Sequence, residues 1–226
     1  MAKMNLVGIV SADIIGSTSL SELGFRHLQR EVHICFDDFA RYVKIPFWGR
    51  LVKGDAIECC VDNPNYVLRL ALLMKCRIKA WADAEDCSPL LKAFGLRFSM
   101  AVGAMRIVDR NHDIMDGEAI YIAGRGLDRI TRSSVTSTFG MVAKDAVITE
   151  IIKNEIQLLD NIVNALSAKQ SAVIYLRLLG MTEMEISRIL RISQSSVNSR
   201  AKGGGWHLIA ETLRVFESIN FSNYVY

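Results

Sequence analysis

A predicted strand that ends in a carboxylate constrains this chain more than any other stretch. Residues 4–12 form an almost unbroken apolar run, which is typical of a strand buried on both faces. Asp13 follows directly, and Gly16-Ser17-Thr18 then forms a turn ahead of a helix. An unpaired charge at the end of a buried strand is costly, and a bound cation is the usual compensation. Because main-chain amides at a helix N-terminus bind anions, the stretch predicts a site for a metal-bound phosphate.

The order of the predicted elements is strand, helix, hairpin, helix, strand, helix, strand. Ser19-x-x-Glu22 predicts a capping box for the first helix, and Gly54-Asp55 predicts a tight hairpin turn. Strands separated by helices, with one antiparallel hairpin, predict an α+β fold: a ferredoxin-like (split βαβ) mixed sheet covered by helices. The predicted strands are 4–12, 47–53, 56–61, 96–107 and 136–143, and the predicted helices 19–44, 63–78, 118–132 and 146–166.

Composition places the chain among soluble globular proteins. Half of the residues are apolar, and the formal net charge is only +3. The N-terminal apolar run is too short and too polar for a signal peptide or a membrane span, so we expect no membrane partner. The cysteines include no Cys-x-x-Cys pair, which favours buried, reduced thiols in a cytoplasmic protein. They are Cys35, Cys59, Cys60, Cys76 and Cys87.

Two acidic residues that are distant in the sequence form the predicted metal site. Asp13 ends the first strand and Asp55 lies in the hairpin turn, so a strand beside the hairpin brings both carboxylates to one point. Hard cations such as Mg²⁺ take oxygen ligands, commonly one or two carboxylates plus substrate phosphates. Gly16, Ser17 and Thr18 offer amides and hydroxyls to those phosphates. Taken singly, Asp13 also suits a capping carboxylate, and Asp55 an ordinary hairpin-turn residue.

At these motifs the chain resembles the catalytic domain of class III nucleotidyl (adenylate/guanylate) cyclases. The similar segments occur in the family's order over roughly residues 4–150 and are Ala12 to Glu22, Lys53 to Ala56, Leu96 to Met105 and Gly117 to Leu127. The resemblance implies a bound nucleoside triphosphate with Mg²⁺ or Mn²⁺, and a homodimer. It implies these roles: metal binding by Asp13, Ile14 and Asp55, nucleotide binding by Gly16, Ser17, Thr18 and Lys53, and catalysis by Arg125.

The chain departs from the cyclase pattern at positions that select the base and support the transition state. Leu51 stands where the family has a purine-recognising Lys, and Ile114 occupies the other base-selecting position. Tyr121 replaces the transition-state Asn, whereas the Arg one helical turn later is retained as Arg125. Losing one transition-state donor typically costs on the order of a hundredfold in rate. These departures favour a nucleotide sensor over an efficient enzyme. Polar residues near the two base-selecting positions are Arg50, Lys53, Asp113 and Asp116.

The C-terminal segment predicts a helix-turn-helix. Ser167-x-x-Gln170 and Thr182-x-x-Glu185 are capping boxes, and Ser193 is placed to cap a third helix. Its predicted core is Ile186, Ile189, Leu190, Ile192, Val197 and Ala201. Short polar side chains at the start of the third helix read base edges, and basic ones hold phosphates. The predicted DNA-binding residues are Arg191, Gln194, Ser195, Ser196, Asn198, Ser199, Arg200 and Lys202.

This segment resembles the helix-turn-helix of sigma-factor region 4 and of response-regulator DNA-binding domains. The similarity lies in Leu178 to Leu190 and Ser193 to Val197, and it implies DNA as the partner. A three-helix protein-interaction module remains the alternative. Gly203-Gly204-Gly205 stands where the third helix would continue, and Gly costs about 1 kcal/mol in a helix interior. We therefore expect that helix to end near Lys202 and residues 206–216 to form a separate amphipathic helix.

We predict a nucleotidyl cyclase-like domain over residues 1–145, a helical connector over 146–166 and a helix-turn-helix DNA-binding domain over 167–226. The preferred interpretation is a transcriptional regulator whose degenerate cyclase-like domain binds a metal-nucleotide and biases DNA binding through the connector. The first alternative is an active class III-type cyclase that makes a cyclic nucleotide and uses the helix-turn-helix for targeting or dimerisation. The second is a dimerisation scaffold that binds no nucleotide.

Overall fold

Six strands form one mixed sheet within the described part of the computed structural model, residues 6–52, 54–82, 87–109, 111–112 and 114–226. The strand order is β2-β3-β1-β4-β5, and β6 pairs in parallel with β4. Because β1 is antiparallel to both β3 and β4, and β2 to β3, the first four strands have the split βαβ arrangement. The predicted α+β fold class is confirmed. The strands are β1 (Leu6–Ile14), β2 (Phe47–Val52), β3 (Ala56–Val61), β4 (Leu96–Asp109), β5 (Ile114–Gly117) and β6 (Ser137–Met141).

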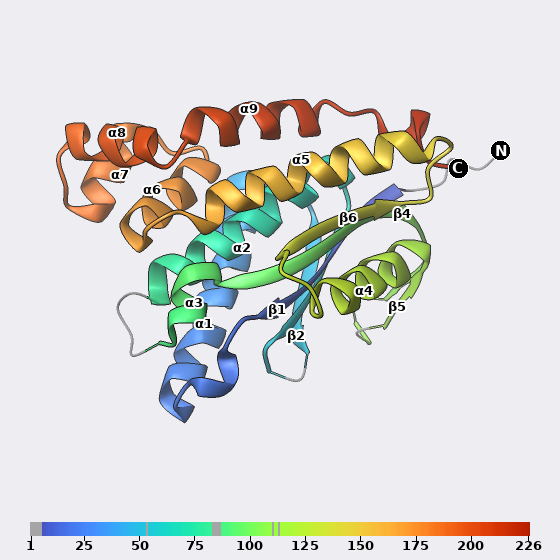
Figure 1. Ribbon diagram of the computed structural model, residues 1–226, viewed down its shortest axis with the longest axis horizontal. Helices are drawn as coiled ribbons and strands as arrows, with labels where there is room; N and C mark the ends of the chain where they lie inside the picture. Colours follow the sequence, from blue (N-terminus) through green and yellow to red (C-terminus); the bar gives the residue numbers. More distant parts are fainter. Residues whose placement is uncertain (1–5, 53, 83–86, 110, 113) are drawn as a thin grey trace.

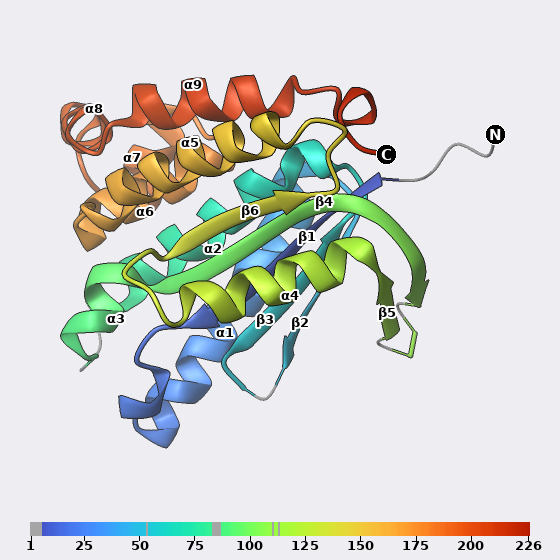
Figure 2. The ribbon, with the colours of Figure 1, turned by 45° about the vertical axis from the view of Figure 1, so that its right-hand side comes forward.

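Helices cover both faces of the sheet (Figures 1 and 2). Successive strand residues point to opposite faces, so Cys59 joins the large core with α1 and α2, whereas Cys60 joins a small core with α4. All five cysteines are buried, as expected. The helices up to this point are α1 (Glu22–Asp38), continued by a π-helical turn (Phe39–Val43), α2 (Val67–Ala82), α3 (Pro89–Phe94), α4 (Glu118–Ile130) and α5 (Ala146–Asn164).

Two local features differ from the sequence-based expectation. Ser21, not Ser19, caps α1: its Oγ accepts from the Gly24 amide at 3.1 Å. The Ser19 hydroxyl instead donates to the Gly16 carbonyl at 2.7 Å, because a short 3₁₀ turn (Ser17–Ser19) precedes the helix. Strand β5 was not predicted, since its four residues are mostly half-exposed and show no apolar alternation; it pairs with the far end of β4.

The C-terminal segment folds into the predicted helices α6 (Ala168–Leu178), α7 (Glu183–Leu190), α8 (Gln194–Gly203) and α9 (Trp206–Glu217). Both predicted capping boxes are present, and Ser193 caps α8. The glycine run separates α8 from α9, with Gly205 at φ +68° before α9 begins. Ile209, Leu213 and Phe216 are buried on one face of α9, as its amphipathic pattern predicts. Among the described residues, no helix combines the length and apolarity that a membrane crossing needs.

The helix-turn-helix segment and the sheet share one continuous hydrophobic core. Helix α6 lies against α2, and the Tyr175 hydroxyl donates to the Asp38 carboxylate of α1 at 2.5 Å. Arg69 of α2 forms an ion pair of 2.6 Å with Glu217 of α9. The predicted division at residues 145 and 166 remains a prediction, but these contacts show that the segments are not independent bodies joined by an exposed linker.

A buried ion pair fixes α5 to α2. The Lys75 ammonium lies 2.6 Å from a carboxylate oxygen of Asp160, and both side chains are almost fully buried. Thr136 donates to the other oxygen of Asp160, and the Asn164 side-chain amide donates to the Thr136 hydroxyl at 2.9 Å. Burial lowers the pKa of Lys75 despite the neighbouring carboxylate. Each of these charges therefore depends on its partner for compensation.

Asp160→Ala should lower the free energy of unfolding by about 3–5 kcal/mol, because it leaves the Lys75 ammonium buried and unpaired. Replacing both partners with apolar residues, in Lys75→Met/Asp160→Leu, should cost much less. Urea denaturation followed by circular dichroism measures both changes. Equal losses in the single and double variants would contradict the ion-pair account.

Candidate functional site

The end of β1 and the β2–β3 turn bring the two predicted metal carboxylates together. Asp13 is paired in register with Ala56 of β3, next to Asp55. The Ile14 amide donates to the Asp55 carbonyl at 3.3 Å, and the Ser17 hydroxyl donates to an Asp55 carboxylate oxygen at 2.7 Å. The strand order thus produces the predicted convergence. The side chain of Ile14 is aliphatic and has no ligand atom, so this residue can offer a ligand only through its main-chain carbonyl.

The neighbours of Asp13 compensate only part of the cost of its negative charge. Burial raises its pKa, the Arg97 guanidinium lowers it, and the charge of Asp55 raises it further, with a net rise. Arg97, on the neighbouring strand β4, forms an ion pair of 3.4 Å with Asp13 but no hydrogen bond to it through that nitrogen. The sequence analysis missed Arg97, although its place opposite Asp13 follows once β4 is paired with β1.

The donor set fits a cation that brings other ligands with it. Among the described residues, no three His, Cys, Asp or Glu side chains cluster closely enough to hold a metal ion. Two carboxylates alone suit Mg²⁺ or Mn²⁺ that keeps water and phosphate oxygens in its remaining positions. With the partly exposed side chain of Asp13, this geometry is compatible with a metal-bound phosphate.

The predicted phosphate turn is only partly available to a ligand. Gly16 has φ +76°, and a Cβ there would lie 2.6 Å from the Ser88 hydroxyl, so the turn requires glycine. Ser17 is buried with its hydroxyl on Asp55, which makes it a positioning residue for that carboxylate. Thr18 is exposed and its hydroxyl faces no such constraint. Lys53 lies outside the described residues.

Arg125 and Tyr121 line a different opening, a cavity of about 700 Å³ beside α4. The Tyr121 hydroxyl donates to Asp116 at 2.7 Å, and Arg106 forms an ion pair with the same carboxylate. Arg125 is exposed at this cavity, whose lining includes neither Asp13 nor Asp55. Within one chain, the predicted catalytic Arg and the predicted metal carboxylates therefore do not meet at this cavity.

The positions that replace base-selecting residues have other structural roles. Leu51 packs against the large hydrophobic core, and Ile114 is half-exposed on β5. Arg50 is engaged by Glu58 through two hydrogen bonds of 3.0 and 2.7 Å and lies over the Trp48 ring. Asp113 lies outside the described residues. No described residue near these positions presents a ready substitute for the family's lysine.

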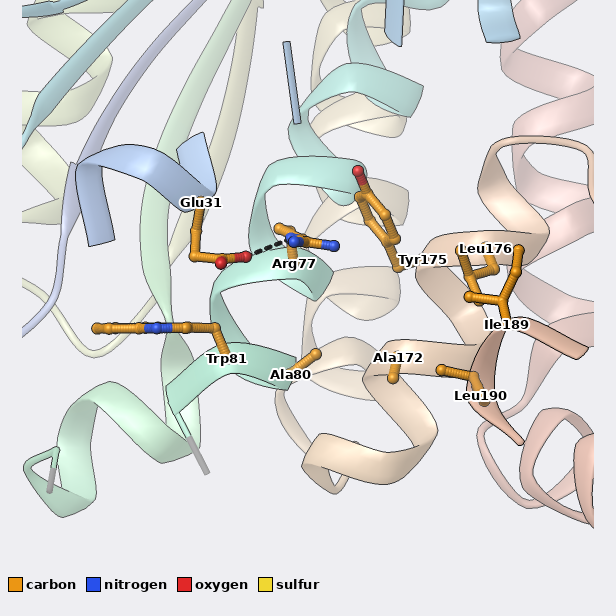
Figure 3. A pocket seen from close by; sticks show the side chains of 9 residues that line it. All are labelled: Glu31, Arg77, Ala80, Trp81, Ala172, Tyr175, Leu176, Ile189 and Leu190. Carbon is orange, nitrogen blue, oxygen red and sulfur yellow. Dashed lines mark hydrogen bonds and ion pairs between the residues drawn. The ribbon is translucent and has the colours of Figure 1, made fainter. Parts of the chain in front are cut away.

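A second cavity, of about 240 Å³, lies between the N-terminal helices α1 and α2 and the helices α6 and α7 (Figure 3). Arg77 of α2 forms an ion pair with Glu31 of α1 and lies over the Tyr175 ring of α6 at 5.3 Å. Ile189 of α7 lines the opposite side and is 54 % exposed. Its predicted place in the helix-turn-helix core is therefore wrong, because α7 turns this side toward the cavity and buries Ile186 instead.

Helix α8 presents a polar and basic surface. Val197 and Ala201 face inward and are buried, Ser196 and Arg200 are half-buried, and the remaining predicted contacts are exposed: Arg191, Gln194, Ser195, Asn198, Ser199 and Lys202. The turn before α8 has defined geometry, since Arg191 is left-handed at φ +51° and the Ser187 hydroxyl donates to the Ile192 carbonyl at 2.6 Å. These side chains thus form one surface around a well-capped helix.

Comparison with protein families matches residues 156–202 to the model described as Sigma-70, region 4. The match spans the second half of α5 together with α6, α7 and nearly all of α8, and it supports a role in DNA-binding transcription regulation. No curated protein matches the chain. A solved structure described as that of a bacterial light-regulated adenylyl cyclase is 14 % identical, with a TM-score of 0.44, over 61 % of this chain and 76 % of the other. A second structure with the same description gives the same TM-score and identity over 43 % of its chain.

Asp13→Asn should stabilise the protein at neutral pH when divalent cations are absent. A carboxyl group whose pKa is higher in the folded state than in the unfolded state costs stability once it ionises. The free energy of unfolding of the wild type should therefore fall as pH rises from the ordinary pKa of an aspartate to the raised pKa of Asp13. The variant should lack this fall. Urea denaturation from pH 3 to 8 in the presence of a chelator measures it, and parallel pH profiles for both proteins would contradict the assignment.

Arg191→Gly should raise the free energy of unfolding by about 1 kcal/mol, because glycine relieves the cost of a left-handed residue between α7 and α8. Arg188→Gly, at an exposed position inside α7, is the matched control and should lower stability by about 1 kcal/mol. Thermal and urea denaturation measure both values. A loss of stability in Arg191→Gly would show that its side chain supports the turn.

Proposed function

We propose that this protein is a DNA-binding transcription regulator that senses a metal-bound nucleoside triphosphate through its α+β part. The observation that carries the DNA-binding half is the exposed face of α8 inside the region that matches Sigma-70, region 4. The nucleotide half is supported by the convergence of Asp13 and Asp55 beside the glycine turn. We further propose that the protein is cytoplasmic and acts as a homodimer.

The α8 surface combines the two kinds of contact that DNA recognition needs. Gln194, Asn198 and Ser199 carry short or amide side chains that can donate to and accept from base edges in the major groove. Arg191 and Lys202 stand at either end of α8, where they can hold phosphates. From Ile186 to Gly205 the sequence contains four basic residues and no acidic one, so the whole surface is attractive to a polyanion.

The metal site supports binding better than turnover. Asp13 and Asp55 can hold Mg²⁺ or Mn²⁺ with a triphosphate, and the amides of the glycine turn can approach its phosphates. Transition-state support needs donors placed at the same point. Tyr121 is engaged by Asp116, and Arg125 lines another cavity. A site that retains the metal carboxylates without these donors is suited to a sensor.

The route from the metal site to DNA runs through α1. This helix begins directly after the glycine turn, and its last residue, Asp38, accepts a hydrogen bond from Tyr175 of α6. Glu31, which precedes Asp38 by about two turns of α1, forms an ion pair with Arg77 beside the cavity that α7 also lines (Figure 3). A ligand that shifts the start of α1 can therefore bias the helices that hold α8, provided that it binds the two arrangements with different affinity.

Nucleotidyl cyclisation is the second candidate, and the exposed Arg125 favours it. In a homodimer whose two copies face each other across α4, Arg125 of one copy could complete the carboxylate site of the other. In this case the helix-turn-helix would serve targeting. The third candidate function is that of a dimerisation scaffold that binds no nucleotide.

Lys202→Ala should weaken binding to all DNA sequences alike and reduce the slope of log affinity against log salt by about 1, because it removes one phosphate contact. Asn198→Ala should instead cost about 1–3 kcal/mol on the preferred sequence only and relax selection at one base. Selection from a random duplex library, followed by fluorescence anisotropy at several salt concentrations, measures both. Glu155→Gln on α5 is the control. Unchanged binding in both α8 variants would favour the protein-interaction module.

Mn²⁺ with a nucleoside triphosphate should raise the melting temperature of the wild type but not of Asp13→Asn or Asp55→Asn. A ligand of the folded state at one hundred times its Kd stabilises it by about 2.7 kcal/mol. Differential scanning fluorimetry measures the shift, and chromatography of the same mixtures detects any cyclic product. A cyclic product that is lost in Asp13→Ala and Asp55→Ala would show that the protein is a cyclase and not a sensor. If no nucleotide shifts the melting temperature, the scaffold without nucleotide binding is the remaining candidate.

A further inference from the structure

A polar cavity of about 290 Å³ lies on the side of α5 that faces the segment before β6. The end of α3 contributes Phe94, the segment contributes Ser134 to Thr136, and β6 contributes Ser137. Helix α5 contributes a row of amide side chains, Asn154, Gln157, Asn161 and Asn164. The cavity adjoins the buried ion pair and is separate from the carboxylate pair at the end of β1, because its lining shares no residue with that site.

The lining is almost entirely uncharged. Asp160 is the only ionisable residue among the described residues that line it, and both carboxylate oxygens of Asp160 are engaged, one by Lys75 and one by Thr136. A charged ligand would find no free counter-charge here, and burying an uncompensated charge is costly. The site is therefore suited to a neutral molecule that forms many hydrogen bonds.

Two buried polar atoms at this cavity lack partners among the described residues. They are the Ser137 hydroxyl oxygen and the Asn164 side-chain carbonyl oxygen. Asn164 donates through its other side-chain atom to Thr136, so its free oxygen needs a donor from elsewhere. Ser137 is 1 % exposed and could donate or accept. Buried polar atoms in folded proteins normally have partners, but both of these atoms are closed to solvent. The side chains open to a ligand are the exposed amides of Asn154 and Asn161.

We propose that this cavity binds a neutral, hydroxyl-rich ring: a monosaccharide or the ribose part of a nucleoside. Vicinal hydroxyl groups both donate and accept, which matches the row of amide side chains on α5. Phe94 provides an apolar wall for the ring face. The volume of about 290 Å³ is enough for a single ring of this kind.

This ligand would bear directly on the DNA-binding helices. Asn164 is the last residue of α5, and α6 begins four residues later. The Asn164 carbonyl also accepts from the buried Lys79 ammonium at 3.1 Å, so the end of α5 is tied to α2 at the same point. A ring bound between α5 and the segment before β6 would stabilise this junction. The proposal does not depend on metal or nucleotide binding at Asp13.

Isothermal titration of the full-length protein with D-ribose, D-glucose, myo-inositol and adenosine tests the proposal. Asn154→Leu and Asn161→Leu remove amides at exposed positions of α5, where the substitutions leave the core intact. Glu155→Leu, also exposed on α5 but outside this lining, is the matched control. At least one probe should bind, each amide variant should bind it about tenfold more weakly, and the control should match the wild type.

The probes also distinguish the source of the ring. Binding of D-ribose and adenosine alike identifies the ribose part, binding of adenosine alone identifies a nucleoside with its base on Phe94, and binding of D-glucose or myo-inositol identifies a free sugar or polyol. Affinity that is unchanged in both amide variants, or no binding by any of the four probes, would overturn the proposal.

Discussion

The ion pair between Lys75 and Asp160 is the interaction on which the arrangement of the molecule depends. It joins the central helix of the large core, α2, to α5, and α5 continues almost directly into the helices of the helix-turn-helix. Because each charge is the other's ion-pair partner among the described residues, moving α5 away from α2 would leave both of them buried and unpaired. The ammonium of Lys79, which donates to the Asn164 carbonyl, fixes the end of the same helix. The orientation of α8 therefore follows from contacts made deep inside the α+β part.

The buried ion pair limits how α5 can transmit a conformational change, compared with the helical connector expected from the sequence. A free helical connector would transmit orientation by swinging, but a helix whose last turns are held by the buried ammonium groups of Lys75 and Lys79 transmits only what its neighbours impose. The contacts that link the glycine turn to the helix-turn-helix run through α1, from Ser21 at its cap to Asp38 at its end, and then to Tyr175. Asp13 lies at the start of this path, and burial raises its pKa. A cation bound there would therefore offset the cost of the buried negative charge and would also add contacts.

Much of the fold follows from local patterns in the sequence. The hairpin turn at Gly54-Asp55, the capping boxes of α6 and α7 and the break after α8 are encoded within a few residues of where they act, and all were predictable. The position of Arg97 beside Asp13 was not, because it depends on strand pairing across 84 residues of chain. The exposure of Ile189 was missed for a similar reason: helical periodicity identifies an apolar face but not the neighbour that covers it. Lys75 and Asp160 lie on separate helices, and only the packing of α5 on α2 reveals that they meet.

The central claim is that occupancy of the carboxylate site changes DNA binding. The most direct measurement is the Kd for the selected DNA sequence at constant salt, with and without saturating Mn²⁺ and each nucleoside triphosphate, in the wild type and in Asp55→Asn. The account predicts at least a fivefold change in Kd for one nucleotide in the wild type, which is the lower end of usual coupling, and none in the variant. A Kd that is identical under all these conditions, while the nucleotide demonstrably binds, would contradict it.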